Sequence, residues 1–178
     1  MTESRELSAS RILDRLLIDV IVGTRSLEIL DTLNARVQIA APIYHGMRRM
    51  AHSHTLLGLC KFSEFYDEFH DLIPNECRTP CKNIKKLIKS KKIYEFRSKY
   101  VAHITDEKTG RPLNPDELEN YIQSIFGVDD SNFVRWVNDQ VNEFPKTVVS
   151  VLEKTRDGIM AANNISKEQM EFGRINAG

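Results

Sequence analysis

The sequence has few of the residues that mark several common kinds of protein. It contains 8 glycines and 6 prolines in 178 residues, which is too few for a chain built from many short strands and turns. It contains three cysteines, Cys60, Cys77 and Cys81, and this small odd number indicates reduced thiols rather than a disulfide framework. Cys77, Cys81 and the nearby His70 do not make up the four-ligand pattern of a zinc site. We therefore expect no metal and no cofactor.

Long hydrophobic runs are also missing. The longest, residues 16–18 and 20–22, is interrupted by Asp19 and falls short of the ~20 apolar residues of a membrane span. Residues 1–6 are polar and lack the basic-then-apolar order of a signal peptide. These observations predict a cytoplasmic protein without membrane contact. The formal net charge of zero argues against a general nucleic-acid coat protein and leaves a local basic patch to be found.

Helical periodicity is what the sequence does have. Apolar residues recur at three- and four-residue steps from about Ser8 to Asn34, and this pattern predicts a long helix. A second long helix is predicted from about Pro42 to Phe69, with the proline in its first turn. Residues 72–80 contain two prolines and predict a loop. A third helix is predicted from Cys81 through Ile104, with Ser90 as the position that could interrupt it.

The C-terminal half predicts two more helices after a turn at residues 105–112. Asn114 and Pro115 are typical of a helix start, and Gly127 is typical of its end. A last long helix is predicted from residues 129–131 to Ile159, with a kink at Pro145. No stretch reads as a strand. We predict one all-α domain over residues 1–162, an antiparallel four-helix bundle with an additional short helix, followed by a polar tail over 163–178.

A cluster of lysines lies along the exposed side of the third predicted helix. Between Lys82 and Lys99 the only acidic residue is Glu95. Exposed charge is the default for lysine, so one interpretation is a solvated face. The other is an electrostatic track for a phosphate backbone. The candidate RNA-binding residues are Lys82, Lys85, Lys86, Lys89, Lys92 and Lys99.

The third predicted helix carries two apolar stripes. One consists of Ile84, Leu87, Tyr94 and Val101, which we expect to face the core of the chain itself. A helix with two apolar sides is either deeply buried or lies between its own core and a partner, and the lysines exclude deep burial. The second stripe therefore predicts a homodimer interface, made by Ile93, Phe96, Tyr100 and Ile104.

Arg97 and His103 lie along the edges of that second stripe. Arginine holds phosphate oxygens in a planar fork, and histidine can take and give a proton near neutral pH. Together they suit cleavage of a phosphodiester without a metal ion. In one continuous helix the two positions would differ by ~9 Å in rise and ~120° in rotation. We therefore expect a site shared between two subunits.

The segment Arg97–His103, with the sequence RSKYVAH, resembles the R-x4-6-H signature of the HEPN superfamily. Members of that superfamily are small helical bundles, usually dimeric, and many are RNases of toxin–antitoxin, abortive-infection and CRISPR systems. The Ile-Thr-Asp that follows is similar to the abortive-infection branch. The resemblance implies a HEPN-like fold, a role in antiviral defence, an antitoxin as a possible partner, and Arg97 and His103 as the catalytic pair. By the same resemblance Ser98 occupies the polar position after the arginine.

Two positions depart from the pattern of that superfamily. Ser98 stands where asparagine, aspartate or histidine is more usual. Thr105 stands where one branch has a tyrosine that a partner antitoxin modifies, so we do not carry over that mode of control.

The function predicted from these residues is a metal-independent endoribonuclease of toxin or phage-defence type. Two alternatives remain at the level of sequence. A dimeric helical interaction module would need the second apolar stripe but not His103. A nucleic-acid-binding protein without chemistry would need the run Lys82–Lys92 and would also make no use of His103.

Overall fold

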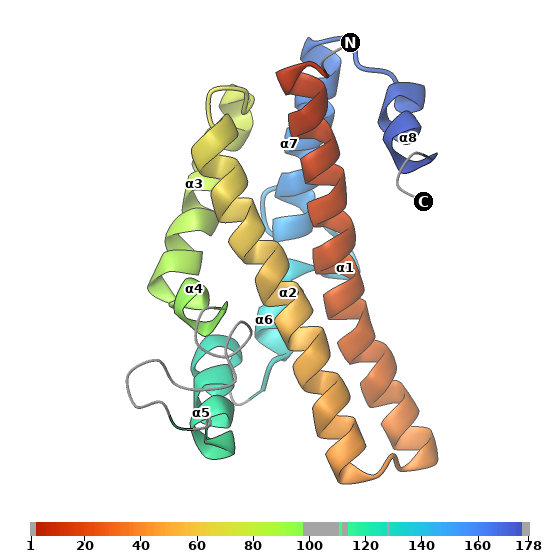
Figure 1. Cartoon of the computed structure of the whole chain (residues 1–178), viewed down its shortest axis with the longest axis vertical. Coiled ribbons are helices and arrows are strands. Elements are labelled where there is room, and N and C mark those ends of the chain that lie inside the picture. The colour runs from red at the N-terminus through yellow and green to blue at the C-terminus, as the bar shows by residue number, and fades with distance from the viewer. Residues whose placement is uncertain (1–2, 98–110, 112–113, 128, 176–178) are drawn as a thin grey trace.

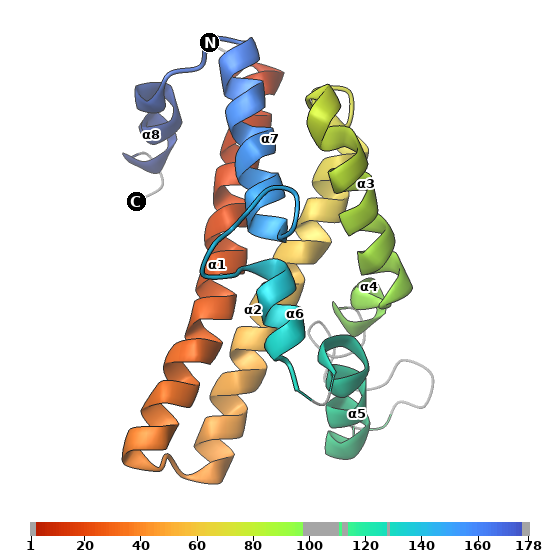
Figure 2. The ribbon, with the colours of Figure 1, turned by 180° about the vertical axis from the view of Figure 1, so that it is seen from behind.

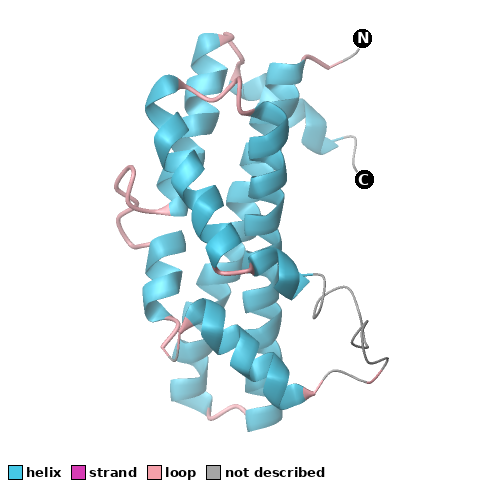
Figure 3. Cartoon of the chain, turned by 90° about the vertical axis from the view of Figure 1, so that its left-hand side faces the viewer, coloured by secondary structure: helices cyan, strands magenta, loops and turns pink. Residues whose placement is uncertain are grey.

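The computed structural model describes residues 3–97, 111, 114–127 and 129–175 (Figure 1). Over this part of the chain every regular element is a helix (Figure 3), which confirms the all-α prediction. No helix within these ranges is both long enough and apolar enough to cross a membrane. The helices are α1 (Arg5–Val37), α2 (Ala41–Phe69), α3 (Asn75–Ser90), α4 (Ile93–Phe96), α5 (Pro115–Phe126), α6 (Ser131–Val137), α7 (Val148–Ala162) and α8 (Lys167–Ile175).

The long hairpin of α1 and α2 runs the length of the molecule (Figure 1). The side chain of Ser4 caps α1 by accepting a hydrogen bond from the amide of Leu7 at 3.2 Å. The helix ends where Gln38 adopts a left-handed conformation with φ of 50°. α2 then starts at Ala41 with Pro42 in its first turn, one residue before the predicted start.

The two helices of the hairpin approach each other closely at two glycines. A Cβ placed on Gly23 would lie 2.9 Å from the backbone nitrogen of Thr55. A Cβ placed on Gly58 would lie 2.8 Å from Cγ1 of Val20. Glycine in mid-helix lowers helix propensity, but here it allows the two backbones to come together.

Helices α3 and α7 lie together over one face of this hairpin (Figure 2). α7 packs against α1, and α3 packs against both α2 and α7 (Figure 2). One continuous apolar core runs between them. Its largest fully buried side chains are Phe62, Phe96, Leu13, Leu16, Leu56, Leu59, Ile73, Ile88, Ile93, Ile125, Leu152 and Ile159.

The third helix differs from the prediction at both ends. α3 begins at Asn75, and Pro80, which we had expected in a loop, lies inside it. α3 ends at Ser90 because Lys92 adopts a left-handed conformation with φ of 55°. A new short helix, α4, starts at Ile93. The helix predicted through Ile104 is therefore interrupted after Ser90, the position that the sequence offered for an interruption, and residues 98–104 lie outside the described ranges.

The C-terminal part also differs from the prediction, apart from α5, which has the predicted bounds. The predicted last helix is two helices, α6 and α7, joined by residues 138–147 with a cis peptide before Pro145. Thr147 and Ser150 form a capping box at the start of α7. The predicted polar tail contains α8, which packs on α1, where Arg11 Nη2 donates to the carbonyl of Gln169 at 2.5 Å (Figure 1).

The close approach at Gly23 leads to a testable prediction. Gly23→Ala will lower the free energy of unfolding by about 2 kcal/mol, because the new methyl group would overlap Oγ1 of the buried Thr55 and lie 2.9 Å from its backbone nitrogen. Gly46 is the matched control in α2, since no atom lies within 4 Å of a Cβ built there. Gly46→Ala will raise the free energy of unfolding by roughly 0.5–1 kcal/mol through helix propensity. Urea unfolding of the two variants measures both, and stabilisation by both would show that the helices do not touch at Gly23.

Candidate functional site

A row of basic residues follows one face of α3. Arg78, Lys82, Lys85, Lys86 and Lys89 are spaced at three- and four-residue steps, so they share a face that spans about 16 Å. All are exposed except Lys85, which is half-buried. We call these five residues the α3 cationic stripe. The apolar side of the same helix is formed by Cys77, Cys81, Ile84 and Ile88, all buried in the core.

Acidic residues on α2 pair with some of the neighbouring cations and leave others unpaired. Asp67 forms an ion pair with Lys85, whose ammonium also lies 5.1 Å from the ring centre of Tyr66. Among the described residues, no carboxylate lies within 4.0 Å of the ammonium groups of the other three lysines, Lys82, Lys86 and Lys89. The stripe therefore carries local positive charge on a chain whose net charge is zero.

Lys91 and Lys92, at the junction of α3 and α4, have different environments. Lys91, which we did not single out from the sequence, points inward and donates a hydrogen bond to the carbonyl of Ile125 at 2.5 Å. This bond connects α5 to the end of α3. Lys92 is exposed and lies 3.8 Å from the carboxylate of Glu95. Both side chains of that ion pair are more than 60% exposed, so it contributes little and Lys92 can exchange Glu95 for a phosphate, while Lys91 has a structural role.

Arg97 is the last residue of the described range 3–97, and it lies on the surface. Its Nη1 donates to Oε1 of Glu64 on α2 at 2.7 Å, and its side chain is 42% exposed. The hydroxyl of Tyr94 lies 3.1 Å from the same carboxylate oxygen and 3.1 Å from the carbonyl of Cys60. Burial, followed by the nearby Glu64, raises the pKa of Tyr94 to about 12, so the phenol stays protonated.

Three of the other candidate residues follow Arg97 and lie outside the described part of the chain. These are Ser98 and His103 of the predicted catalytic set and Lys99 of the predicted RNA-binding set. Of the catalytic residues, the structure therefore describes Arg97.

The predicted dimer stripe needs a correction. Ile93 and Phe96 are 0% and 1% exposed, and Phe96 packs against the ring of Tyr121 at 5.9 Å between centroids. The left-handed turn at Lys92 changes the phase of the helix, so these two side chains enter the core while Tyr94 faces outward. Buried side chains offer no surface to a second subunit. The other two members of the stripe, Tyr100 and Ile104, lie outside the described residues.

A second polar cluster, which the sequence did not reveal, joins α2 to the start of α6. His52 Nε2 lies 2.8 Å from Oδ2 of Asp130, and Arg48 bonds both Asp130 and Asp31. The imidazole packs on the ring of Phe126 with 4.1 Å between centroids. The sequence indicated no carboxylate partner for His52, because Asp130 is far away in the chain.

The His52 cluster is a buried polar contact between α2 and the start of α6 and not a site open to a ligand. His52 is 6% exposed, so a substrate has no access to its ring. The hydrogen bond from His52 and the charge of Arg48 hold the pKa of Asp130 below its usual value. The ionised carboxylate therefore stabilises the folded state.

Comparisons with known proteins support the fold and leave the function open. No protein-family model and no curated protein matches this chain. The chain is similar to a solved structure from the mobile metagenome of V. paracholerae, the integron cassette protein Vpc_cass2. The TM-score is 0.76 with 19% sequence identity, over 89% of this chain and 98% of that protein. At this identity the likeness shows a shared fold alone.

The lowered pKa of Asp130 makes a prediction about stability. Asp130→Asn will lower the free energy of unfolding by about 2 kcal/mol at pH 7, because Arg48 then loses a charged partner in a largely buried setting. The full loss of stability is expected above pH ~3.9, the pKa of an aspartate in the unfolded chain. The loss shrinks as the pH falls below that value, because the Asp130 carboxylate of the wild type then becomes protonated and also loses its charge. Chemical unfolding of both proteins between pH 7 and pH 2 measures this difference.

Asp157→Asn is the control for that experiment. Asp157 is 62% exposed and pairs with its neighbour Arg156, so its removal will change stability by less than about 1 kcal/mol. A difference between wild type and Asp130→Asn that stays constant with pH would contradict the assigned role.

Proposed function

We propose that this chain binds single-stranded RNA along the α3 cationic stripe and cleaves it, without a metal ion, at Arg97 and His103. The observation that carries this proposal is the stripe itself. Lys82, Lys86 and Lys89 have no acidic partner among the described residues, and α3 leads through Lys92 and α4 to the exposed Arg97.

The charges around the stripe favour a path for the strand along α3. Each phosphate neutralised by a lysine releases condensed counterions, which supplies sequence-independent affinity. Glu64 and Asp67 lie on the neighbouring face of α2 and would repel a phosphate backbone that crossed α2. The strand would thus follow the outer face of α3 towards Arg97.

The ion pair of Arg97 with Glu64 is compatible with a change of partner. Both side chains are substantially exposed, at 42% and 53%, and ion pairs of that kind contribute only about 0–1 kcal/mol. Arg97 can therefore leave Glu64 for a phosphate at little cost. Its fork of donors would then stabilise the negative charge that builds on the non-bridging oxygens of the phosphate.

In the proposed reaction the 2′-oxygen of a ribose attacks the adjacent phosphorus, and the bond to the 5′-oxygen breaks. His103 takes the proton of the 2′-hydroxyl, and water or a second histidine protonates the leaving 5′-oxygen. The products are a 2′,3′-cyclic phosphate and a 5′-hydroxyl, and DNA is spared because it lacks the 2′-hydroxyl. The resemblance of Arg97–His103 to the HEPN superfamily supports these roles and assigns Ser98 the position beside the arginine. The homodimer stays a prediction, and its surface cannot include the buried Ile93 and Phe96.

The cleavage proposal predicts activity in the presence of a chelator. The wild type will cut single-stranded RNA in excess EDTA and leave cyclic phosphate ends, and Arg97→Ala and His103→Ala will each be slower by at least about 100-fold. Separation of labelled RNA fragments on a denaturing gel measures the rate. His45→Ala, which removes an exposed histidine on α2, is the matched control and will cut as the wild type does. Intact RNA after incubation with the wild type, or full cleavage by His103→Ala, would refute the catalytic assignment.

The binding proposal is tested separately with 2′-O-methyl RNA, which cannot be cleaved by this chemistry. Lys86→Glu and Lys89→Glu will each weaken binding about tenfold at low salt and reduce the slope of log K against log salt by about 0.7. Fluorescence anisotropy measures both quantities. Arg49→Glu, a charge reversal at an exposed residue on the N-terminal half of α2, will have little effect. Equal weakening by Arg49→Glu would mean that net charge, and not the stripe, attracts RNA.

A further inference from the structure

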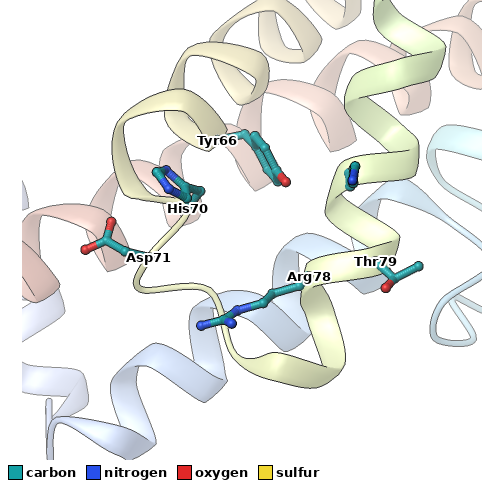
Figure 4. A pocket seen from close by; sticks show the side chains of 6 residues that line it. Tyr66, His70, Asp71, Arg78 and Thr79 are labelled. Carbon is teal, nitrogen blue, oxygen red and sulfur yellow. The ribbon is translucent and has the colours of Figure 1, made fainter.

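A pocket lies where the chain turns from α2 into α3, at the opposite end of α3 from Arg97. It has a volume of about 520 Å³, within the range of about 300–1,000 Å³ that is usual for small-molecule sites. Figure 4 shows open space between Tyr66 and His70 on the α2 side and Arg78 on the α3 side. The full lining consists of Tyr66, His70, Asp71, Arg78, Thr79 and Lys82.

Two of the lining residues, Arg78 and Lys82, are cations. Arg78 donates its Nε–H to the carbonyl of Ile73 at 3.2 Å, and this bond orients the guanidinium. Lys82 follows one turn later on the same face of α3. Within the described ranges, no carboxylate forms an ion pair with Arg78 or Lys82, so both charges are available to a ligand.

The remaining lining residues add hydrogen-bonding groups and one acid. Tyr66, His70 and Thr79 supply a phenol, an imidazole and a hydroxyl. Asp71 brings a negative charge, but Arg5 holds its carboxylate with two hydrogen bonds, of 2.6 and 2.9 Å. That contact lowers the pKa of Asp71 to about 2, so the carboxylate stays ionised and its negative charge is balanced by Arg5. The net charge that faces the pocket is therefore positive.

We propose that this pocket binds the phosphate of a phosphomonoester, either a free mononucleotide or the phosphorylated end of an RNA strand. A phosphomonoester carries close to two negative charges at neutral pH, which matches one guanidinium and one ammonium. Arg78 offers a planar pair of donors to two phosphate oxygens, and Lys82 acts as a point charge on the third. The volume leaves room for the attached group beside the rings of Tyr66 and His70. The site is separate from the proposed cleavage at Arg97 and does not depend on it.

Isothermal titration calorimetry with adenosine 5′-monophosphate and with adenosine tests this assignment. The wild type will bind the monophosphate and not the nucleoside. Lys82→Ala will weaken binding about tenfold, Arg78→Gln will weaken it at least as much, and Lys82→Arg will retain most of the affinity. Arg49→Ala removes an exposed charge from α2 outside the pocket and is the control that will bind as the wild type does. Circular dichroism of each variant will show whether its fold is intact.

A second arm identifies the source of the phosphate. A 2′-O-methyl RNA with a 5′-phosphate is compared with the same strand bearing a 5′-hydroxyl. If the phosphorylated strand binds more tightly and Lys82→Ala removes this difference, the pocket is assigned to an RNA end. If the two strands bind equally and the monophosphate still binds, the pocket is assigned to a free nucleotide. The proposal is overturned if neither phosphorylated ligand binds through the pocket, if adenosine binds as well as its monophosphate, or if Arg49→Ala and Lys82→Ala lose equal affinity. Because no arm measures cleavage, a failure of the RNase proposal leaves this result unchanged, and the reverse also holds.

Discussion

The contact between α1 and α2 at Gly23 and Gly58 is the constraint on which the other helices depend. The two backbones come close enough that a Cβ at Gly23 would meet Thr55 and one at Gly58 would meet Val20. This leaves one broad apolar face on the hairpin, where α7 covers α1, α3 covers α2, and α3 and α7 also pack against each other. The orientation of α3, and hence of the proposed functional groups, follows from how it closes that surface.

The division of α3 into an apolar side and a charged side connects the core to the proposed function. Cys77, Cys81, Ile84 and Ile88 occupy the core, which forces the α3 cationic stripe outward. Burial raises the pKa of Cys81, and also that of Cys60 on α2, to about 11, so these thiols remain protonated and serve as small packing groups. The three cysteines are free and buried, in agreement with the absence of a disulfide framework expected from the sequence.

Acidic residues on α2 and in the turn that follows it decide which cations remain available to a ligand. Glu64, Asp67 and Asp71 pair with Arg97, Lys85 and Arg5, respectively. What remains is positive charge along α3, with the pocket at one end and the weakly held Arg97 beyond the other. A chain with zero net charge can thus present a strongly uneven surface, because its opposite charges lie on neighbouring helices rather than cancelling at every point.

The sequence by itself determined the all-α class, the extents of α1, α2 and α5 to within a few residues, and the basic character of residues 82–92. These properties depend on apolar spacing, capping residues and charge within short segments, so they can be read locally. The tertiary structure alone decided which side of residues 93–96 is buried, since one left-handed residue, Lys92, changed the phase of the helix. It also decided the partners of His52 and Arg97 and the convergence of His70 with Arg78 and Lys82, because each joins residues from different helices. Such contacts depend on how the helices pack, so the spacing of residues along the chain does not predict them.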